Sequence, residues 1–206
     1  MQVRGLVWAA ALLLAVALLG WAAGHGLTRD LDLRIAASLS LQRGRSPDWL
    51  IAATQGISWL GGGPQRTVIV VLIALALWRW CGAAAGSAMA LASLTSNWAS
   101  TWLKLDFARP RPQLVPHLDD VGTSLSYPSG HATSAAVVYL LLALVLPRRH
   151  RPWWLGLAAL LTMLTGLSRI MLGVHYASDV VGGWMLGSAF ALIGFGLVRR
   201  QQAIRR

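Results

Sequence analysis

A short polar stretch, residues 168–179, separates two long apolar segments, yet it carries an arginine, a histidine and an aspartate. If the chain is helical from His175 onward, His175 and Asp179 are four residues apart and lie on one helix face, within hydrogen-bond reach. A carboxylate on one imidazole nitrogen fixes the tautomer and makes the other nitrogen a better base or nucleophile. Arg169 is not on that face, so a turn near Gly173 is needed to bring it close. Taken alone, the stretch also fits a polar loop between two membrane helices.

The composition is that of a membrane protein. Of 206 residues, 56% are hydrophobic and only 12% are charged, whereas soluble domains carry about 25% charged residues. Eighteen basic residues against seven acidic ones suggest nucleic acid at first sight. The basic residues do not gather on one amphipathic face, however, and the long apolar segments exclude nucleic acid as the partner. A single cysteine, Cys81, excludes an internal disulfide and a cysteine-based metal site.

The apolar segments predict an all-α, polytopic membrane protein with six transmembrane helices in a bundle. The six segments are residues 5–24, 67–80, 83–103, 132–146, 153–167 and 180–198, and all eight prolines lie outside them. Residues 27–41 and 49–60 are shorter and mixed in character, which favours interfacial helices between the first two spans. We expect residues 1–206 to form one domain.

The first apolar segment admits a second interpretation. Its twenty residues make about 30 Å of helix, enough to cross a bilayer. A signal peptide with a cleavage site near Gly24 is the alternative, but the apolar core of a signal peptide is only about 7–15 residues long. We therefore favour an uncleaved first helix.

Six spans place both termini on the same side of the membrane. A count of basic residues is equal on the two sides, but the short segments at 148–151 and 199–200 are rich in arginine. Basic residues close to span ends favour the cytoplasm, so we expect both termini to be cytoplasmic. Three polar stretches, residues 104–112, 127–131 and 168–179, then meet at the outer face.

These three stretches supply groups suited to binding phosphate. Lys104, Arg111 and Arg169 would form a pocket selective for anions. Ser129 and Gly130 stand at a helix N-terminus, where a hydroxyl, backbone N–H groups and the helix dipole favour an anion. Single cations at an interface often only extend toward lipid headgroups, but three clusters on one face favour a pocket.

The pattern resembles the type 2 phosphatidic acid phosphatase superfamily of membrane lipid phosphatases. Its signature is K-x6-RP, PSGH and SR-x5-H-x3-D, and all three parts are complete between residues 104 and 179. The matching residues are Lys104, Arg111, Pro112, Pro128, Ser129, Gly130, His131, Ser168, Arg169, His175 and Asp179. A further Arg-Pro pair begins at Arg109, but the six-residue spacing selects Arg111.

The resemblance implies a role for each of these side chains. His175 would attack phosphorus and form a phosphohistidine, with Asp179 orienting it. His131 would protonate the leaving oxygen and then activate water. The nonbridging oxygens would be held by Lys104, Arg111, Ser129, Gly130 and Arg169, and Arg109, Tyr127 and Ser168 are further candidates. Neither a cofactor nor a metal is implied, and the outer aspartates other than Asp179 do not pair at ligand spacing.

The expected substrate is an amphiphile with a terminal phosphate or diphosphate, reached from the outer leaflet of a bacterial cytoplasmic membrane. Undecaprenyl diphosphate is the first choice, and phosphatidylglycerophosphate, phosphatidate and lipid A phosphate are alternatives. A membrane protein that binds lipid phosphate without hydrolysing it would need only the cations, not the two histidines. A transporter would be expected to carry broken helices or charges at mid-membrane, which the apolar segments lack.

Overall fold

The computed structural model describes residues 2–121 and 125–204, and within them the chain is helical, without a strand. The elements are α1 (Gln2–Gly24), α2 (Arg29–Leu39), α3 (Asp48–Trp59), α4 (Gly63–Cys81), α5 (Ala83–Phe107), α6 (Gly130–Val145), the short 3-10 helix η1 (Arg148–His150), α7 (Arg151–Met171) and α8 (Ala177–Ile204). The predicted all-α class is therefore confirmed.

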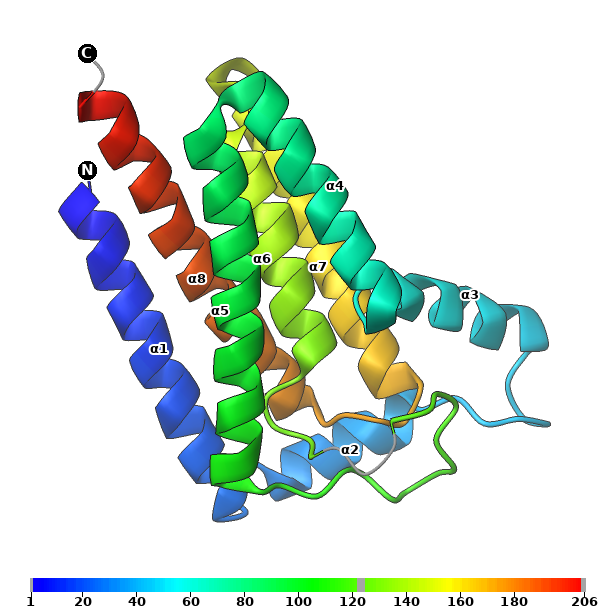
Figure 1. Ribbon diagram of the computed structural model, residues 1–206. Coiled ribbons are helices and arrows are strands. Elements are labelled where there is room, and N and C mark those ends of the chain that lie inside the picture. Colours follow the sequence, from blue (N-terminus) through cyan, green and yellow to red (C-terminus); the bar gives the residue numbers. More distant parts are fainter. Residues whose placement is uncertain (1, 122–124, 205–206) are drawn as a thin grey trace.

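Six long helices, α1 and α4 to α8, form a bundle with the two ends of the chain at the same end (Figure 1). Helix α8 packs against α1, α5, α6 and α7. Helix α2 lies across the opposite end of the bundle, and α3 projects to one side. The connections that carry the polar motifs, α5 to α6 and α7 to α8, also lie at that opposite end.

Three segments are long and apolar enough to cross a membrane: Arg4–Gly24, Arg148–Met171 and Ala177–Ala203. Helix α6 is apolar but shorter. Each of the six predicted spans coincides with a helix, but six crossings stay a prediction. Large apolar side chains such as Leu14 and Val71 are exposed on the outside of the bundle, as expected of helices that face lipid.

Several helices continue beyond the predicted spans. Helix α5 reaches Phe107, α6 begins at Gly130, and α7 reaches Met171. Hydropathy marks the part of a helix that contacts lipid, whereas backbone hydrogen bonding continues past it. Lys104, His131 and Arg169 therefore stand on terminal helical turns, which hold them more rigidly than the predicted loops would.

Helix α1 is part of the folded bundle. The hydroxyl of Tyr127 donates a hydrogen bond of 2.6 Å to the carbonyl of Val16. Gly20 lies against the rings of Phe107 and Tyr127, so that a Cβ there would meet both. These contacts hold α1 against the rest of the bundle. They also enclose Tyr127 completely, so in this structure its side chain packs between helices.

Close packing of α8 against α6 fixes the start of α6. A Cβ on Gly183 would come within 2.6 Å of the carbonyl oxygen of Ser129, and one on Gly187 would meet the carbonyl of Thr133. The G-x-x-x-G pair in α8 thus lets two backbones approach, as such pairs do in membrane helices. It sets the position of the α6 N-terminus relative to α8.

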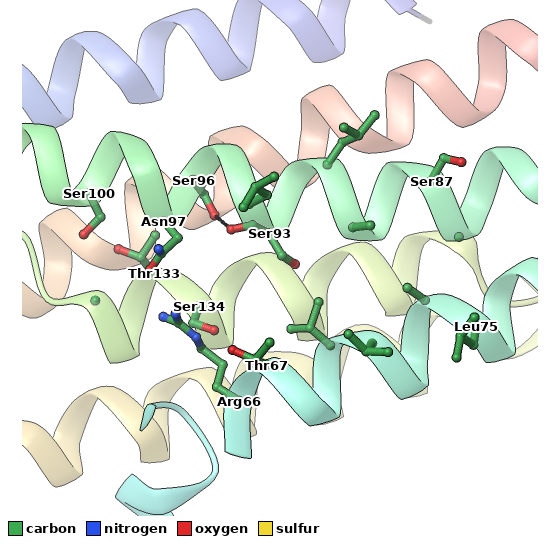
Figure 2. Close-up of a pocket in the computed structure, with 18 of the residues that line it drawn as sticks. Arg66, Thr67, Leu75, Ser87, Ser93, Ser96, Asn97, Ser100, Thr133 and Ser134 are labelled. Carbon is green, nitrogen blue, oxygen red and sulfur yellow. Dashed lines mark hydrogen bonds between the residues drawn. The ribbon is translucent and has the colours of Figure 1, made fainter. Parts of the chain in front are cut away.

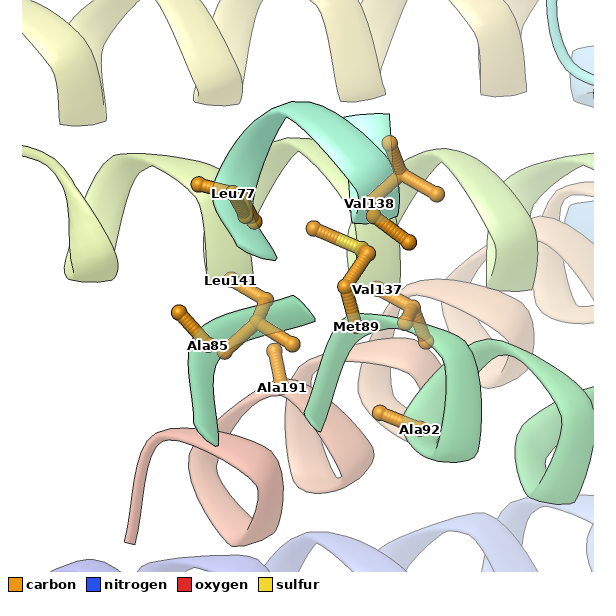
Figure 3. Close-up of a cluster of buried hydrophobic side chains, with 9 residues drawn as sticks. Leu77, Ala85, Met89, Ala92, Val137, Val138, Leu141 and Ala191 are labelled. Carbon is orange, nitrogen blue, oxygen red and sulfur yellow. The ribbon is translucent and has the colours of Figure 1, made fainter. Parts of the chain in front are cut away.

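A groove of about 670 Å³ runs between α4, α5 and α6 (Figure 2). Gly130 and Thr133 line one end of it, near the start of α6, while Leu75 and Ser87 mark the other end. Its lining is mostly apolar between these ends. A buried cluster joins the same three helices to α8 (Figure 3), with Leu77, Met89, Val137, Leu141 and Ala191 among its members.

Candidate active site

A tight turn after α7 brings His175 back over Arg169. Gly173 adopts a φ of 74°, a conformation that a residue with a Cβ rarely takes. The amides of Val174 and His175 then both donate to the carbonyl of Arg169, at 3.1 and 3.3 Å. The predicted turn around Gly173 is therefore present. Helix α8 begins only at Ala177, so His175 precedes the helix instead of lying in its first turn.

His175 and Asp179 are nevertheless in contact. The Nδ1 atom of His175 lies 3.4 Å from Oδ2 of Asp179. The backbone amide of Tyr176 donates to the same Oδ2 at 2.8 Å, and both side chains are buried. The carboxylate thus faces Nδ1 and leaves Nε2 directed away from it, which is the arrangement a nucleophilic imidazole needs.

Ser126 bridges the two, although nothing in the sequence singles it out. Its hydroxyl donates to Oδ2 of Asp179 and lies 3.3 Å from Nδ1 of His175. Ser126 is fully buried, although it belongs to a stretch that reads as a polar loop. Because it falls outside the three motifs, only the fold reveals its position.

One cation contacts the other side of the imidazole, and a second lies nearby. Arg111 donates to the carbonyl of Val174 at 2.6 Å and to Nε2 of His175 at 3.1 Å. Lys104 donates to the carbonyls of Leu125 and Ser126, at 2.6 and 3.1 Å. Burial and the neighbouring charge of Arg169 lower the pKa of Arg111 to about 10. Cations that are crowded in this way favour the binding of an anion between them.

Arg169 holds an anion already, the carboxylate of Asp119. Its NH1 group donates to that carboxylate and to the hydroxyl of Ser58. Arg169 is buried, and its Nε has no hydrogen-bond partner among the described residues. Asp119, from the connection between α5 and α6, therefore occupies the guanidinium where the resemblance places a phosphate. Ser168 lies on the same turn, and its hydroxyl donates to the carbonyl of Thr165.

Arg109, a further candidate for phosphate, has two carboxylate partners in this structure. Its guanidinium lies 2.5 Å from Asp179 and 2.8 Å from Asp32. Asp32 is buried and also accepts a hydrogen bond from the amide of Ser178 at 2.9 Å. Helix α2 is thereby joined to the start of α8, and the second oxygen of Asp179 is held in place. Nothing in the sequence singles out Asp32, because its position in an amphipathic helix carries no signal of this contact.

The start of α6 supplies the remaining groups. The amide of Ser129 donates to the carbonyl of Asp179 at 2.9 Å. The hydroxyl of Ser129 is buried and has no partner within the described part of the chain. His131 stands on the first turn of α6, with Gly62 against its imidazole. The same short region therefore gathers a free hydroxyl, a helix N-terminus and a second histidine.

Comparison with known proteins decides the family, because a family model described as the PAP2 superfamily matches residues 82–203. The chain belongs to the PAP2 superfamily. It is 32% identical over 145 residues to phosphatidylglycerophosphatase B of Bacillus subtilis, covering 68% of this chain and 70% of that one. It is 30% identical over 151 residues to undecaprenyl-diphosphatase BcrC of the same organism, covering 67% and 70%.

A solved structure is similar over nearly the whole PAP2 chain. The crystal structure of a transmembrane PAP2 type phosphatidylglycerolphosphate phosphatase from Bacillus subtilis covers 96% of this chain and 97% of its own, with a TM-score of 0.80 and 29% identity. The predicted family is confirmed, and this PAP2 protein is an integral membrane protein of a phosphatase family. The fold brings Lys104, Arg111, His131 and His175 to one end of the bundle.

In this PAP2 chain, Gly62 lies against the His131 ring, and we expect the position of that ring to depend on the missing side chain at residue 62. The backbone of Gly62 is extended (φ −144°, ψ −178°), so alanine fits its conformation. A Cβ there would collide with the His131 ring, however. The resemblance implies that His131 transfers the proton in the reaction. On that role we expect Gly62→Ala to displace the imidazole and to lower kcat roughly 100-fold, the effect of misplacing a catalytic group by about 1 Å.

The matched control is Gly56→Ala in α3, where a Cβ would meet nothing within 4 Å. Rates of phosphate release and thermal unfolding would be measured for both variants. If Gly62→Ala keeps the rate of the control, the position of His131 does not depend on this contact.

Proposed function

We propose that the protein hydrolyses the terminal phosphate of a membrane lipid through a phosphohistidine on His175. The observation that carries the proposal is the buried His175, held at Nδ1 by Asp179 and Ser126 while Nε2 faces Arg111. An imidazole with one nitrogen fixed by a carboxylate and the other beside a cation is suited to attack an anionic phosphorus centre.

In the first step, Nε2 of His175 attacks phosphorus and the bond from phosphorus to the lipid oxygen breaks. His131 gives its proton to that oxygen, which leaves as the lipid alcohol or phosphate. Asp179 stabilises the positive charge that forms on His175. The arriving phosphate would accept the hydrogen bond that Arg111 donates to Nε2 of His175 in the free protein. It would also replace the Asp119 carboxylate as the partner of Arg169.

In the second step, His131 removes a proton from water as the water oxygen attacks the phosphohistidine. The N–P bond breaks and inorganic phosphate is released. Lys104, Arg111 and Arg169, with the hydroxyl of Ser129 and the amide of Gly130, hold the nonbridging oxygens in both steps. No step in this sequence needs a cofactor or a metal.

The substrate proposed is undecaprenyl diphosphate, the first choice from the sequence. The mostly apolar groove between α4, α5 and α6 offers room for a lipid chain beside the start of α6. We propose that six helices cross a bacterial cytoplasmic membrane, with the catalytic end toward the periplasm and residues 1–206 acting as one unit. The similarity to undecaprenyl-diphosphatase BcrC supports this choice.

A second candidate substrate is phosphatidylglycerophosphate. One observation favours it: the similarity to the Bacillus subtilis phosphatidylglycerolphosphate phosphatase extends over 96% of the chain. The catalytic groups would act in the same way on either lipid, because each lipid ends in a terminal phosphate group and that phosphate is the one attacked.

The test is phosphate release by purified protein in detergent, with undecaprenyl diphosphate, phosphatidylglycerophosphate and phosphatidate offered in parallel. We expect turnover of the first to be fastest and unaffected by EDTA. Release from none of the three would contradict the proposed activity, and a strong loss in EDTA would contradict the metal-independent mechanism.

The pH dependence of kcat/KM follows from the charges around His175. Burial, followed by the charges of Arg111 and Lys104, holds the pKa of His175 well below its usual 6.5. The neutral, nucleophilic form is present above that pKa, so we expect no loss of activity from His175 until the pH is well below 6.5. Arg111→Gln removes one of these charges and should move this acid limb to higher pH. An acid limb at the same pH in both proteins would contradict the electrostatic account.

A further inference from the structure

One end of the groove between α4, α5 and α6 is polar, in contrast to the rest. Arg66 extends from α4 toward Ser134 on α6, and Asn97 and Ser100 from α5 lie at the same end (Figure 2). Toward the other end the groove is lined by side chains such as Leu75. A cation and three neutral polar side chains thus stand where an otherwise apolar groove begins.

The polar groups at this end have unused hydrogen-bonding capacity. Within residues 2–121 and 125–204, the Arg66 guanidinium has neither an ion-pair nor a hydrogen-bond partner, although it is partly buried. The hydroxyl of Ser100 is buried and likewise has no partner in that part of the chain. Leaving such groups without partners at a buried or partly buried place is unfavourable, so a polar ligand bound at this end would gain hydrogen bonds from them.

The polar end of the groove adjoins the histidine that protonates the leaving oxygen. Gly130, which lines the groove, directly precedes His131. Gly62, which touches the His131 ring, stands four residues before Arg66, or about one helical turn. Along the path of a bound lipid the order is therefore His175, His131, Arg66 and then the apolar groove.

This order decides which part of a lipid meets Arg66. With the terminal phosphate at His175, the scissile oxygen lies at His131 and the chain lies in the groove. The next group toward the chain then falls at Arg66. In a polyprenyl diphosphate that group is the phosphate that stays on the product, and in phosphatidylglycerophosphate it is the glycerol followed by an anionic phosphodiester. In phosphatidate it is only neutral glycerol ester.

We propose that Arg66, with Asn97, Ser100 and Ser134, forms a subsite for the second, retained phosphate of the lipid. The subsite rests on the proposed function and narrows its substrate class to lipids that carry two phosphates. Arg66 is then a specificity residue, since a monophosphate lipid gains nothing from it. A guanidinium is suited to this task because it presents several donors to a phosphate in a fixed plane.

Arg79, on the same helix, provides the contrast. It stands in the last turn of α4, is exposed, and does not line the groove. A cation that merely extends toward lipid headgroups would behave like Arg79, so Arg79→Gln is the matched control for Arg66→Gln.

The experiment compares pairs of lipids that differ in the second phosphate. Farnesyl diphosphate and farnesyl monophosphate share one chain, and phosphatidylglycerophosphate and phosphatidate share another. For Arg66→Gln we expect kcat/KM to fall roughly 10- to 100-fold on the first member of each pair, the effect of losing a charged hydrogen bond. The second members should change less than about twofold, Arg66→Lys should recover part of the loss, and Arg79→Gln should resemble the wild type.

Equal losses on both members of a pair would overturn the subsite, because Arg66 would then serve the attacked phosphate or the fold. Unchanged rates on all four would overturn it as well. A loss confined to one pair identifies which of the two lipid classes the subsite fits. Monophosphate turnover by Arg66→Gln also shows that the variant is folded.

A binding measurement separates this inference from the proposed activity. The methylene-bridged diphosphonate analogue of farnesyl diphosphate cannot be cleaved, so its affinity is measurable whether or not the protein hydrolyses lipids. We expect Arg66→Gln to weaken its binding by a similar factor and to leave the binding of farnesyl phosphonate unchanged. Equal affinity of wild type and Arg66→Gln for the diphosphonate would contradict the subsite, even if the wild type proves to be an active phosphatase.

Discussion

Replacing His175 with alanine is expected to abolish turnover while leaving the bundle folded. The imidazole forms the covalent bond to phosphorus in the proposed reaction, and no other histidine among the described residues contacts the carboxylate of Asp179. Removing the nucleophile from a unit that includes an orienting carboxylate lowers kcat by roughly 10⁴-fold or more in comparable enzymes. Phosphate release from the preferred lipid would be measured under single-turnover and steady-state conditions.

His117→Ala is a suitable control for this variant. His117 lies in the connection between α5 and α6, and its Nε2 contacts the carbonyl of Pro112 at 2.7 Å, away from the imidazole of His175. We expect it to change the rate by less than about tenfold. Appreciable activity in His175→Ala, above a tenth of the wild-type rate, would remove His175 from the role of nucleophile.

Replacing Asp179 with asparagine is expected to have the second largest effect. The carboxylate faces Nδ1 of His175, accepts from Ser126 and pairs with Arg109. An amide of the same shape cannot stabilise the charged imidazole and favours the wrong tautomer, which lowers kcat by roughly 10⁴-fold in a comparable His–Asp pair. It also leaves Arg109 with one carboxylate where it had two, so some loss of stability is expected.

The companion variant Asp32→Asn separates these two effects. Asp32 shares Arg109 with Asp179 but contacts neither histidine in the structure. We expect Asp32→Asn to lower the temperature of unfolding while reducing kcat far less than Asp179→Asn. If the two variants lose activity equally, Asp179 acts mainly through its ion pair with Arg109. That result would contradict the proposal that Asp179 acts by orienting His175.

The side chains proposed to be catalytic lie in short motifs with fixed spacing, so the sequence alone was enough to propose them. The turn at Gly173 was predictable as well, since only a reversal joins Arg169 to His175 over six residues. Ser126 and Asp32 were not predictable, because their contacts with Asp179 and Arg109 join segments that are distant in the chain. Only the packing of α2 and of the α5–α6 connection against the start of α8 creates them.

The helices were predictable from hydropathy, and their ends were not. Apolar character stops where lipid contact stops, so the sequence places Lys104 and Arg169 just outside the spans, while the backbone carries both on the last turns of α5 and α7. The contact between Asp119 and Arg169 lay beyond sequence reasoning for another reason. An aspartate in a polar connection has the same local pattern whether it is solvated or paired with a buried arginine.

The most direct test of the account is to trap phosphate on the protein during turnover. Lipid substrate labelled with ³²P in its terminal phosphate would be mixed with enzyme, quenched within milliseconds in alkali, where phosphohistidine is stable, and the labelled peptide identified by mass spectrometry. The account predicts label on His175 that appears before free phosphate, decays on acid treatment and is absent in His175→Ala. Rapid release of free phosphate with no label on the protein at any time would contradict the phosphohistidine mechanism.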